Sequence, residues 1–154
     1  MFLPDTLAHE FQKEAFLIST DKSKLDIDVI HDYLSKRSYW AENIPREIVE
    51  RSIQHALVFG MYHNNAQIGF ARVTTDFATY GYLADVFILE NYRGQGLSKW
   101  LMDCIFNQTP ELQGFRRWSL ATADAHGLYE QFGFTALARP ERMMEKVNFT
   151  KYEK

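Results

Sequence analysis

Apolar residues near the start of the chain change from strand-like to helical spacing. The run Ala15–Thr20 is short, apolar and closed by polar residues, which is typical of a strand. From Ile27 to Leu34 apolar residues recur at helical spacing, and Asp26 precedes them as a candidate N-cap. We expect a strand followed by a helix over about residues 27–37.

A second helix and a hairpin are expected next. Pro45 suits the first turn of a helix, because its fixed φ angle and missing N–H are tolerated there. The alternating stretch of residues 56–76 is typical of two strands joined at Asn64 and Asn65, since asparagine tolerates the left-handed conformations of tight turns.

The second half of the chain alternates strands with helices. The run Tyr82–Glu90 is almost entirely apolar, as expected of a central strand with both faces covered. A helix should follow at about Leu97, with an apolar stripe on one side. The remaining expected elements are a strand at residues 117–123, a short helix at 124–133 capped by Asp124 and ending at Gly133, and one or two closing strands at 134–138 and 142–149.

This order predicts an α/β (α+β) fold with a single mixed, mostly antiparallel central sheet of about six or seven strands, flanked by about four helices. Residues 1–14 show no sustained period and should form an N-terminal arm, so the domain is expected to cover residues 15–154. A chain of 154 residues with 46% hydrophobic content can bury a substantial core as one domain.

Charge and cysteine content narrow the possible partners. The formal net charge is −3 at pH 7, so no cationic excess drives binding to nucleic-acid phosphates. The single cysteine, Cys104, excludes an internal disulfide and a multi-cysteine metal site, and no metal is expected. No apolar run approaches the roughly 20 residues that span a bilayer, and the amino terminus lacks the pattern of a signal peptide. We expect a cytoplasmic protein that binds neither nucleic acid nor membrane, as a monomer or homodimer.

The sequence Arg93-Gly94-Gln95-Gly96 lies between the predicted central strand and the helix after it. A helix N-terminus offers unpaired N–H groups and a partial positive charge, and glycines let an anion approach that backbone. Arg93 would add a cation, so the turn is a candidate phosphate site, although two glycines also suit a simple tight turn. Neither a dinucleotide fold nor a P-loop fits, because position 99 is Lys99 rather than a third glycine and Gly-Lys-Ser/Thr is absent.

Two motifs together resemble the GCN5-related N-acetyltransferase (GNAT) superfamily. In that superfamily an Arg/Gln-x-x-Gly-x-Gly/Ala turn follows the fourth strand and holds the coenzyme A pyrophosphate; Arg93–Ser98 matches it, with serine at the last position. The superfamily's Leu-Tyr-x-x-x-Gly-Phe segment matches Leu128–Phe134 without departure. The agreement in element order and motifs extends from about residue 15 to 147, and the pair of motifs is far more specific than either alone.

The resemblance implies a sheet splayed between its fourth and fifth strands, where acetyl-CoA (coenzyme A) binds. The pantetheine arm would pair with the backbone of the fourth strand, and the pyrophosphate would lie on the glycine turn. Tyr129 would donate a proton to the departing thiolate, whereas the alternative for a helix tyrosine is packing alone. The residues that the resemblance places at the coenzyme are Val86, Phe87, Ile88, Arg93, Gly94, Gln95, Gly96, Leu97, Ser98 and Lys99, with Thr122 and Tyr129 as further contacts.

Two residues are candidates for removing a proton from an acceptor amine, which is mostly protonated because alkyl ammonium groups have pKa values near 10. Asp85 interrupts an apolar strand, where a carboxylate is costly unless it is paired or functional. Strand alternation places it on one face with Leu83 and Phe87, and an ion pair with Arg72 is the alternative to a role as base or substrate contact. His126, on the helical face of the predicted acid, is a second candidate base or else a surface residue.

Aromatic and acidic residues indicate where the acceptor binds. Tyr39 and Trp40 precede the second predicted helix, and Asp76 and Tyr80 lie between two predicted strands. Aromatic faces and carboxylates together suit a cationic amine, and Asp85 would contact the same substrate. The alternative is ordinary packing for the aromatics and solvated loop positions for the acids.

These features predict an acetyl-CoA-dependent N-acetyltransferase that transfers an acetyl group directly to a primary amine of a small molecule or peptide. Its catalytic residues would be Tyr129, Asp85 and His126. One alternative is a catalytically weak acyl-CoA-binding sensor or interaction module on the same fold, and another is transfer to a hydroxyl or of a longer acyl chain. Cys104 lies on the apolar helix stripe and should be an inert packed thiol.

Overall fold

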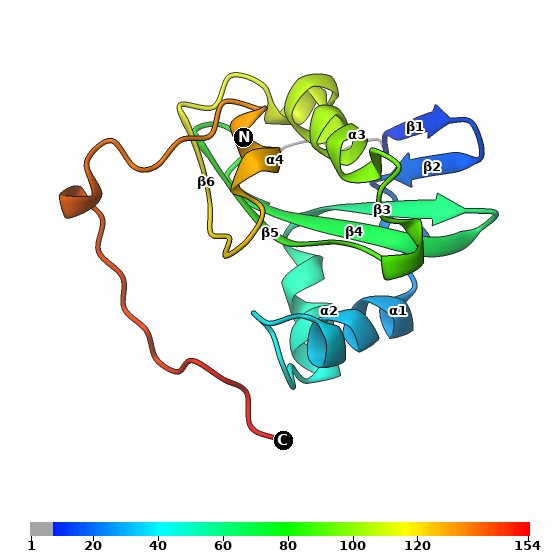
Figure 1. Cartoon of the computed structure of the whole chain (residues 1–154), viewed down its shortest axis with the longest axis horizontal. Helices are drawn as coiled ribbons and strands as arrows, with labels where there is room; N and C mark the ends of the chain where they lie inside the picture. Colours follow the sequence, from blue (N-terminus) through cyan, green and yellow to red (C-terminus); the bar gives the residue numbers. More distant parts are fainter. Residues whose placement is uncertain (1–7) are drawn as a thin grey trace.

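The computed structural model describes residues 8–154 and consists of one sheet with helices on both of its faces (Figure 1). The six strands lie side by side in chain order, and every neighbouring pair is antiparallel except β5 and β6, which are parallel. The predicted single, mixed, mostly antiparallel sheet is therefore confirmed. The strands are β1 Glu10–Lys13, β2 Phe16–Ser19, β3 Leu57–His63, β4 Ala66–Thr75, β5 Tyr80–Ile88 and β6 Arg117–Leu120.

Four α-helices cover the sheet, with α1 and α2 on one face and α3 and α4 on the other (Figure 1). The α-helices are α1 Ile27–Asp32, α2 Arg46–Gln54, α3 Leu97–Asp103 and α4 His126–Glu130. Two of them continue directly into π-helical turns, α1 into Tyr33–Arg37 and α3 into Cys104–Gln108. Short 3-10 turns occupy Lys22–Lys24, Glu90–Tyr92, Pro110–Leu112 and Pro140–Arg142. No helix within residues 8–154 is long and apolar enough to cross a membrane.

Local sequence signals account for several element ends. The Asp26 carboxylate accepts a hydrogen bond from the Val29 N–H at 3.3 Å, which caps α1 as predicted. The β3–β4 hairpin turns at Asn64 and Asn65, whose φ angles of 50° and 68° lie in the left-handed region that asparagine tolerates. Pro45 stands one residue before α2 rather than within its first turn.

Each face of the sheet has its own hydrophobic core, because successive strand side chains point to opposite sides. On β3, Val58 packs with α1 and α2, whereas Phe59 packs with α3 on the other face, and both are fully buried. The β5 strand lies between β4 and β6, so it is an interior strand, as predicted.

Three predictions about the chain ends and caps are wrong. Four residues of the predicted arm, Glu10–Lys13, form edge strand β1, which pairs with β2, while residues 1–7 lie outside the described residues. Residues 134–138 and 142–149 are not strands, because the chain leaves the sheet after α4. Asp124 does not cap α4; instead the Thr122 hydroxyl accepts the Ala125 N–H at 3.0 Å.

Candidate active site

The strands β5 and β6 part halfway along β5. Their parallel pairing ends at Leu83 and Leu120, although β5 continues to Ile88. On its other side, β5 remains paired with β4 as far as Ile88. One backbone edge of β5 from Ala84 onward therefore has no strand partner within the described residues. This confirms the predicted splay; the fourth and fifth predicted strands are β5 and β6 here, because β1 adds a strand before them.

A cleft of about 380 Å³ occupies the gap between the parted strands. One wall is the open part of β5, and the opposite wall is the chain that follows β6. The α1–α2 loop and α4 complete the lining. The lining residues are Tyr39, Trp40, Tyr82, Leu83, Ala84, Asp85, Val86, Leu120, Ala121, Thr122, Ala123, Asp124, Ala125 and Tyr129.

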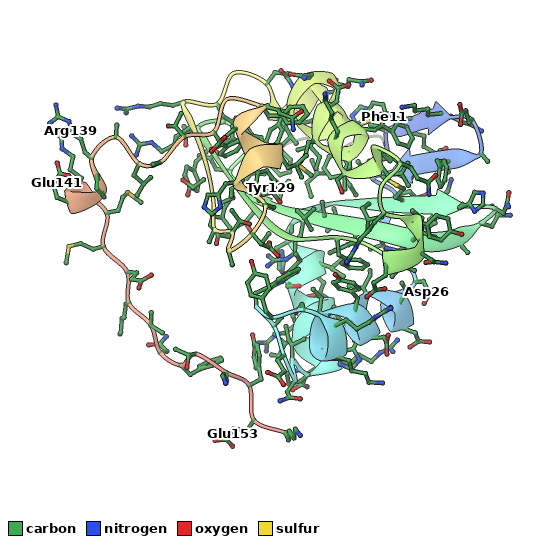
Figure 2. The ribbon with its side chains drawn as sticks, in the orientation of Figure 1. Phe11, Asp26, Tyr129, Arg139, Glu141 and Glu153 are labelled. Atoms are coloured by element: carbon green, nitrogen blue, oxygen red, sulfur yellow. The ribbon has the colours of Figure 1, made fainter. Side chains whose placement is uncertain are left out.

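Tyr129 lies on α4 against this cleft (Figure 2) and is only 8% exposed. Its hydroxyl makes no hydrogen bond to any residue in the described part of the chain. Burial raises the pKa of Tyr129 to about 12, with smaller contributions from Tyr39 and Asp124. The side chain therefore keeps its proton at neutral pH and is free to give a hydrogen bond to a group in the cleft.

The glycine turn follows β5 and leads directly into α3. Gly94 and Gly96 have φ angles of 81° and 79°, and a Cβ added at either would meet nothing within 4 Å. Gly96 occupies the N-cap position of α3, and no side chain bonds to the N–H groups at that helix start. The start of α3 thus has no side-chain cap, and the space beside Gly94 and Gly96 is open; an anion site requires both features.

Arg93 makes two hydrogen bonds within the protein. Its Nε donates to the Ile88 carbonyl at 3.0 Å, and a second guanidinium nitrogen donates to the Tyr33 hydroxyl at 2.7 Å. Tyr33 in turn stacks on Phe87, with ring centroids 4.1 Å apart. The guanidinium thus fastens the glycine turn to the end of β5. Gln95 is also engaged locally, because its side-chain amide donates to the Tyr92 carbonyl at 3.2 Å.

Asp85 sits at a bulge that reverses the faces of β5. Phe70 pairs with Phe87, and Arg72 pairs with Ala84. Between these pairs β4 advances by two residues and β5 by three, so β5 contains one extra residue. Asp85 lies in this bulge and has a φ of 56°. Leu83 consequently packs with α3, whereas Phe87 packs with α1 and α2. The prediction that Leu83, Asp85 and Phe87 share one face is wrong, because one extra residue breaks the alternation.

Both carboxylate oxygens of Asp85 accept hydrogen bonds. Arg72 Nε lies 2.8 Å from one oxygen, and the indole N–H of Trp40 lies 3.0 Å from the other. The Asp85 side chain is 11% exposed and that of Arg72 is 20% exposed, so the charges neutralise each other in a largely buried site. The ion pair with Arg72, left open by the sequence, is present.

The α1–α2 loop bridges the cleft. The Tyr39 hydroxyl accepts the Ala123 N–H at 2.8 Å, which ties this loop to the segment after β6. Tyr39 and Trp40 pack edge to face, with centroids 5.0 Å apart, and both remain partly exposed. Sequence reasoning missed both the Trp40–Asp85 bond and this bridge, although adjacent aromatics in a predicted loop were a signal for them.

Other predicted site residues lie outside the cleft. His126 begins α4, is exposed and does not line the cleft. Asp76 belongs to the β4–β5 turn, where it accepts N–H groups of its own turn, and Tyr80 lies at the start of β5. Cys104 is fully buried, and burial raises the pKa of its thiol to about 12, as expected of an inert packed cysteine.

Comparisons with known proteins bear on this arrangement. Residues 54–136 match the model of the acetyltransferase (GNAT) domain family. A protein of Gibberella zeae that carries the provisional name acetyltransferase is 31% identical over 136 residues, covering 74% of this chain and 75% of its own length. This chain belongs to the GNAT acetyltransferase family.

Solved structures agree with this GNAT assignment. A GNAT-family protein from Xanthomonas campestris pv. campestris, provisionally named an acetyltransferase, is 50% identical with a TM-score of 0.83, covering 86% of this chain and 92% of that chain. A GNAT family acetyltransferase from Elizabethkingia anophelis, solved with acetyl-CoA bound, shares the fold at 18% identity with a TM-score of 0.57, covering 80% of this chain and 78% of that chain.

Proposed function

We propose that this protein is an acetyl-CoA-dependent N-acetyltransferase that transfers an acetyl group directly to a primary amine of a small molecule or peptide. One observation carries the proposal: the cleft that exposes the unpaired edge of β5 is also the cleft that contains Tyr129. Hydrogen-bond donors for a carbonyl and a protonated group for a leaving thiolate thus lie in one site.

The residues present fit the coenzyme. The uncapped N–H groups at the start of α3 suit its diphosphate, and the open space over Gly94 and Gly96 allows close approach to that backbone. The open edge of β5 lies next to this turn, and its unpaired peptide groups are available for the amides of the pantetheine arm. Arg93 supports the turn through its hydrogen bonds to the Ile88 carbonyl and the Tyr33 hydroxyl.

Acetyl-CoA supplies an acetyl thioester, whose carbonyl carbon the amine attacks and whose sulfur leaves as a thiolate. Backbone N–H groups on the open edge of β5 would stabilise the negative charge that develops on the carbonyl oxygen. Tyr129, still protonated at neutral pH, would donate its hydroxyl proton to the thiolate. The amine nitrogen keeps the acetyl group as an amide and releases one proton.

We place the acceptor amine between Tyr39, Trp40 and Asp85, at the other side of the same cleft. Asp85 accepts hydrogen bonds from Arg72 and from the Trp40 indole, and these two contacts fix its side chain beside the cleft. We therefore assign it a positioning role and assign proton removal to water. Positioning two reactants is worth roughly 7 to 11 kcal/mol, so transfer does not require a dedicated base.

A thiol-release assay with acetyl-CoA across a panel of amines and matched alcohols tests this function. We expect turnover with at least one primary amine and none with the alcohol of the same skeleton. Coenzyme A should raise the Tm, whereas an equal concentration of ADP should not. Binding without turnover of any acceptor would favour the sensor alternative, and no effect of coenzyme A on Tm would refute the coenzyme site itself.

A further inference from the structure

The last part of the chain stands apart from the body of the protein. Every residue from Thr135 to Lys151 is exposed. Figure 1 shows this segment in orange and red, running outward past β6 and then down towards α2, and Figure 2 shows Arg139 and Glu141 far from the sheet. Only the end returns, where Tyr152 packs against the α1–α2 core and its carbonyl accepts the Asn43 side-chain amide at 3.5 Å.

This exposed segment is too apolar for a solvated tail. Five of the eight exposed large hydrophobic residues in the described chain belong to it, and Met144 is 95% exposed. Clusters of exposed apolar residues mark surfaces that another molecule covers. The five residues are Leu137, Met143, Met144, Val147 and Phe149.

The sequence of the segment favours a strand that its own chain does not pair. Residues 142–149 were predicted as a closing strand, and Val147 and Phe149 would share one face of it. At the same time, β6 pairs with β5 along one edge only, and its other edge has no partner within residues 8–154. An unpaired edge is a template for pairing with another chain.

A groove of about 720 Å³ runs beside that free edge. Its lining includes four aromatic side chains, Phe106, Trp118, Phe132 and Phe134, and the apolar side chains of Leu137 and Met143. Arg117 of β6 also lines it and makes no ion pair with any described residue. Residues 135–139, Arg142 and Met143 form one wall of the groove. The chain beyond Met143 does not line it, so the groove remains open to a segment from elsewhere.

We propose that Met144–Phe149 of one chain adds as a strand to the free edge of β6 in a second copy, and that the second copy returns the same segment. The exchange places Val147 and Phe149 against the aromatic groove and brings Glu145, on the same strand face, to Arg117, which has no ion pair among the described residues. Such a reciprocal contact is closed and two-fold, so it yields a dimer rather than a filament. It would also brace β6, whose continuation forms one wall of the cleft.

Light scattering after size-exclusion chromatography tests the exchange. We expect the full chain to have twice its 18.0 kDa mass at micromolar concentrations. Val147→Asp would place an unpaired charge in the groove, so the mass should halve. Because the Val147 side chain is 56% exposed, this variant should keep the Tm of a folded monomer. The control Val147→Thr keeps the branched shape and strand propensity, so it should remain a dimer.

Hydrogen exchange locates the contact. In the wild type, amides of residues 117–120 and 144–149 should exchange slowly, and both sets should exchange faster in Val147→Asp. A wild-type mass of one chain would overturn the proposal, as would a dimer that Val147→Asp leaves intact. If the mass halves but the β6 amides exchange at an unchanged rate, the segment docks elsewhere and the proposed pairing with β6 is wrong.

Discussion

The two ends of β5 both carry turns that present backbone N–H groups, but only one turn satisfies them itself. Before β5, the Asp76 carboxylate accepts the N–H groups of Ala78, Thr79 and Tyr80 at 2.9, 2.7 and 3.3 Å. After β5, the N-cap of α3 is Gly96, and no side chain reaches the N–H groups that follow it.

The difference separates a turn that its own side chain caps from one that is a candidate for binding. Hydrogen bonds from the Thr79 hydroxyl and from backbone N–H groups hold the pKa of Asp76 well below its usual range. This carboxylate is therefore already used by its own loop. At the glycine turn, the same kind of donor has no side-chain cap. The two turns therefore differ in whether a side chain of the protein binds their backbone N–H groups, and this difference is more informative than their residue types.

The largest effect should come from closing the open turn. Gly96→Glu adds a carboxylate beside the free N–H groups of α3, where it occupies them and repels a diphosphate. We expect coenzyme A binding to be abolished in isothermal titration calorimetry. A left-handed φ costs any substituted residue roughly 1 to 2 kcal/mol, so Gly96→Ala is the matched control and should still bind. Loss of binding in both variants would mean that strain, not occupied donors, is responsible.

A smaller effect on activity is expected from a change in the cleft between β5 and β6. Tyr129→Phe removes the hydroxyl but keeps the buried ring, so kcat should fall about 10²-fold while the affinity for coenzyme A changes little. Because the pKa of Tyr129 is raised to about 12, any loss of rate between pH 8 and 10 should be the same in both proteins. Stopped-flow thiol release checks this; an unchanged kcat would remove Tyr129 as the acid.

The smallest effect on activity is expected at the self-satisfied turn. Asp76→Ala should lower the Tm by a few degrees and leave kcat and KM unchanged. The pKa of Asp76 is lower in the folded protein, so its stabilisation is present above the ordinary aspartate pKa near 4 and is lost as the pH falls below it. The Tm difference from the wild type, followed by circular dichroism, should therefore shrink in acid. A raised KM at neutral pH would contradict a purely structural role.

Much of the fold follows from short-range signals in the sequence. The α1 cap at Asp26 and the hairpin at Asn64 and Asn65 depend on residues within a few positions of one another. The glycine turn and Tyr129 were found through two motifs, and the cleft between β5 and β6 agrees with what those motifs imply.

The rest depends on contacts that a local pattern does not contain. Nothing in the alternation of β5 reveals the extra residue at Asp85, which moves Phe87 to the other face. Arg93 donates to the hydroxyl of Tyr33, 60 positions away in the sequence, a contact that the local motif does not contain. Asp76 has the residue type of a substrate ligand, but its carboxylate accepts hydrogen bonds from the N–H and the hydroxyl of Thr79 in its own turn.

The central claim is that α3 begins with backbone donors that an external diphosphate occupies. A titration of isotope-labelled protein with coenzyme A, followed by amide chemical shifts, tests it most directly. We predict large, saturable shifts for the amides of residues 96–99 and of residues 84–87, and unchanged shifts for residues 78–80. Unchanged amides at residues 96–99 when the coenzyme is fully bound would contradict the claim.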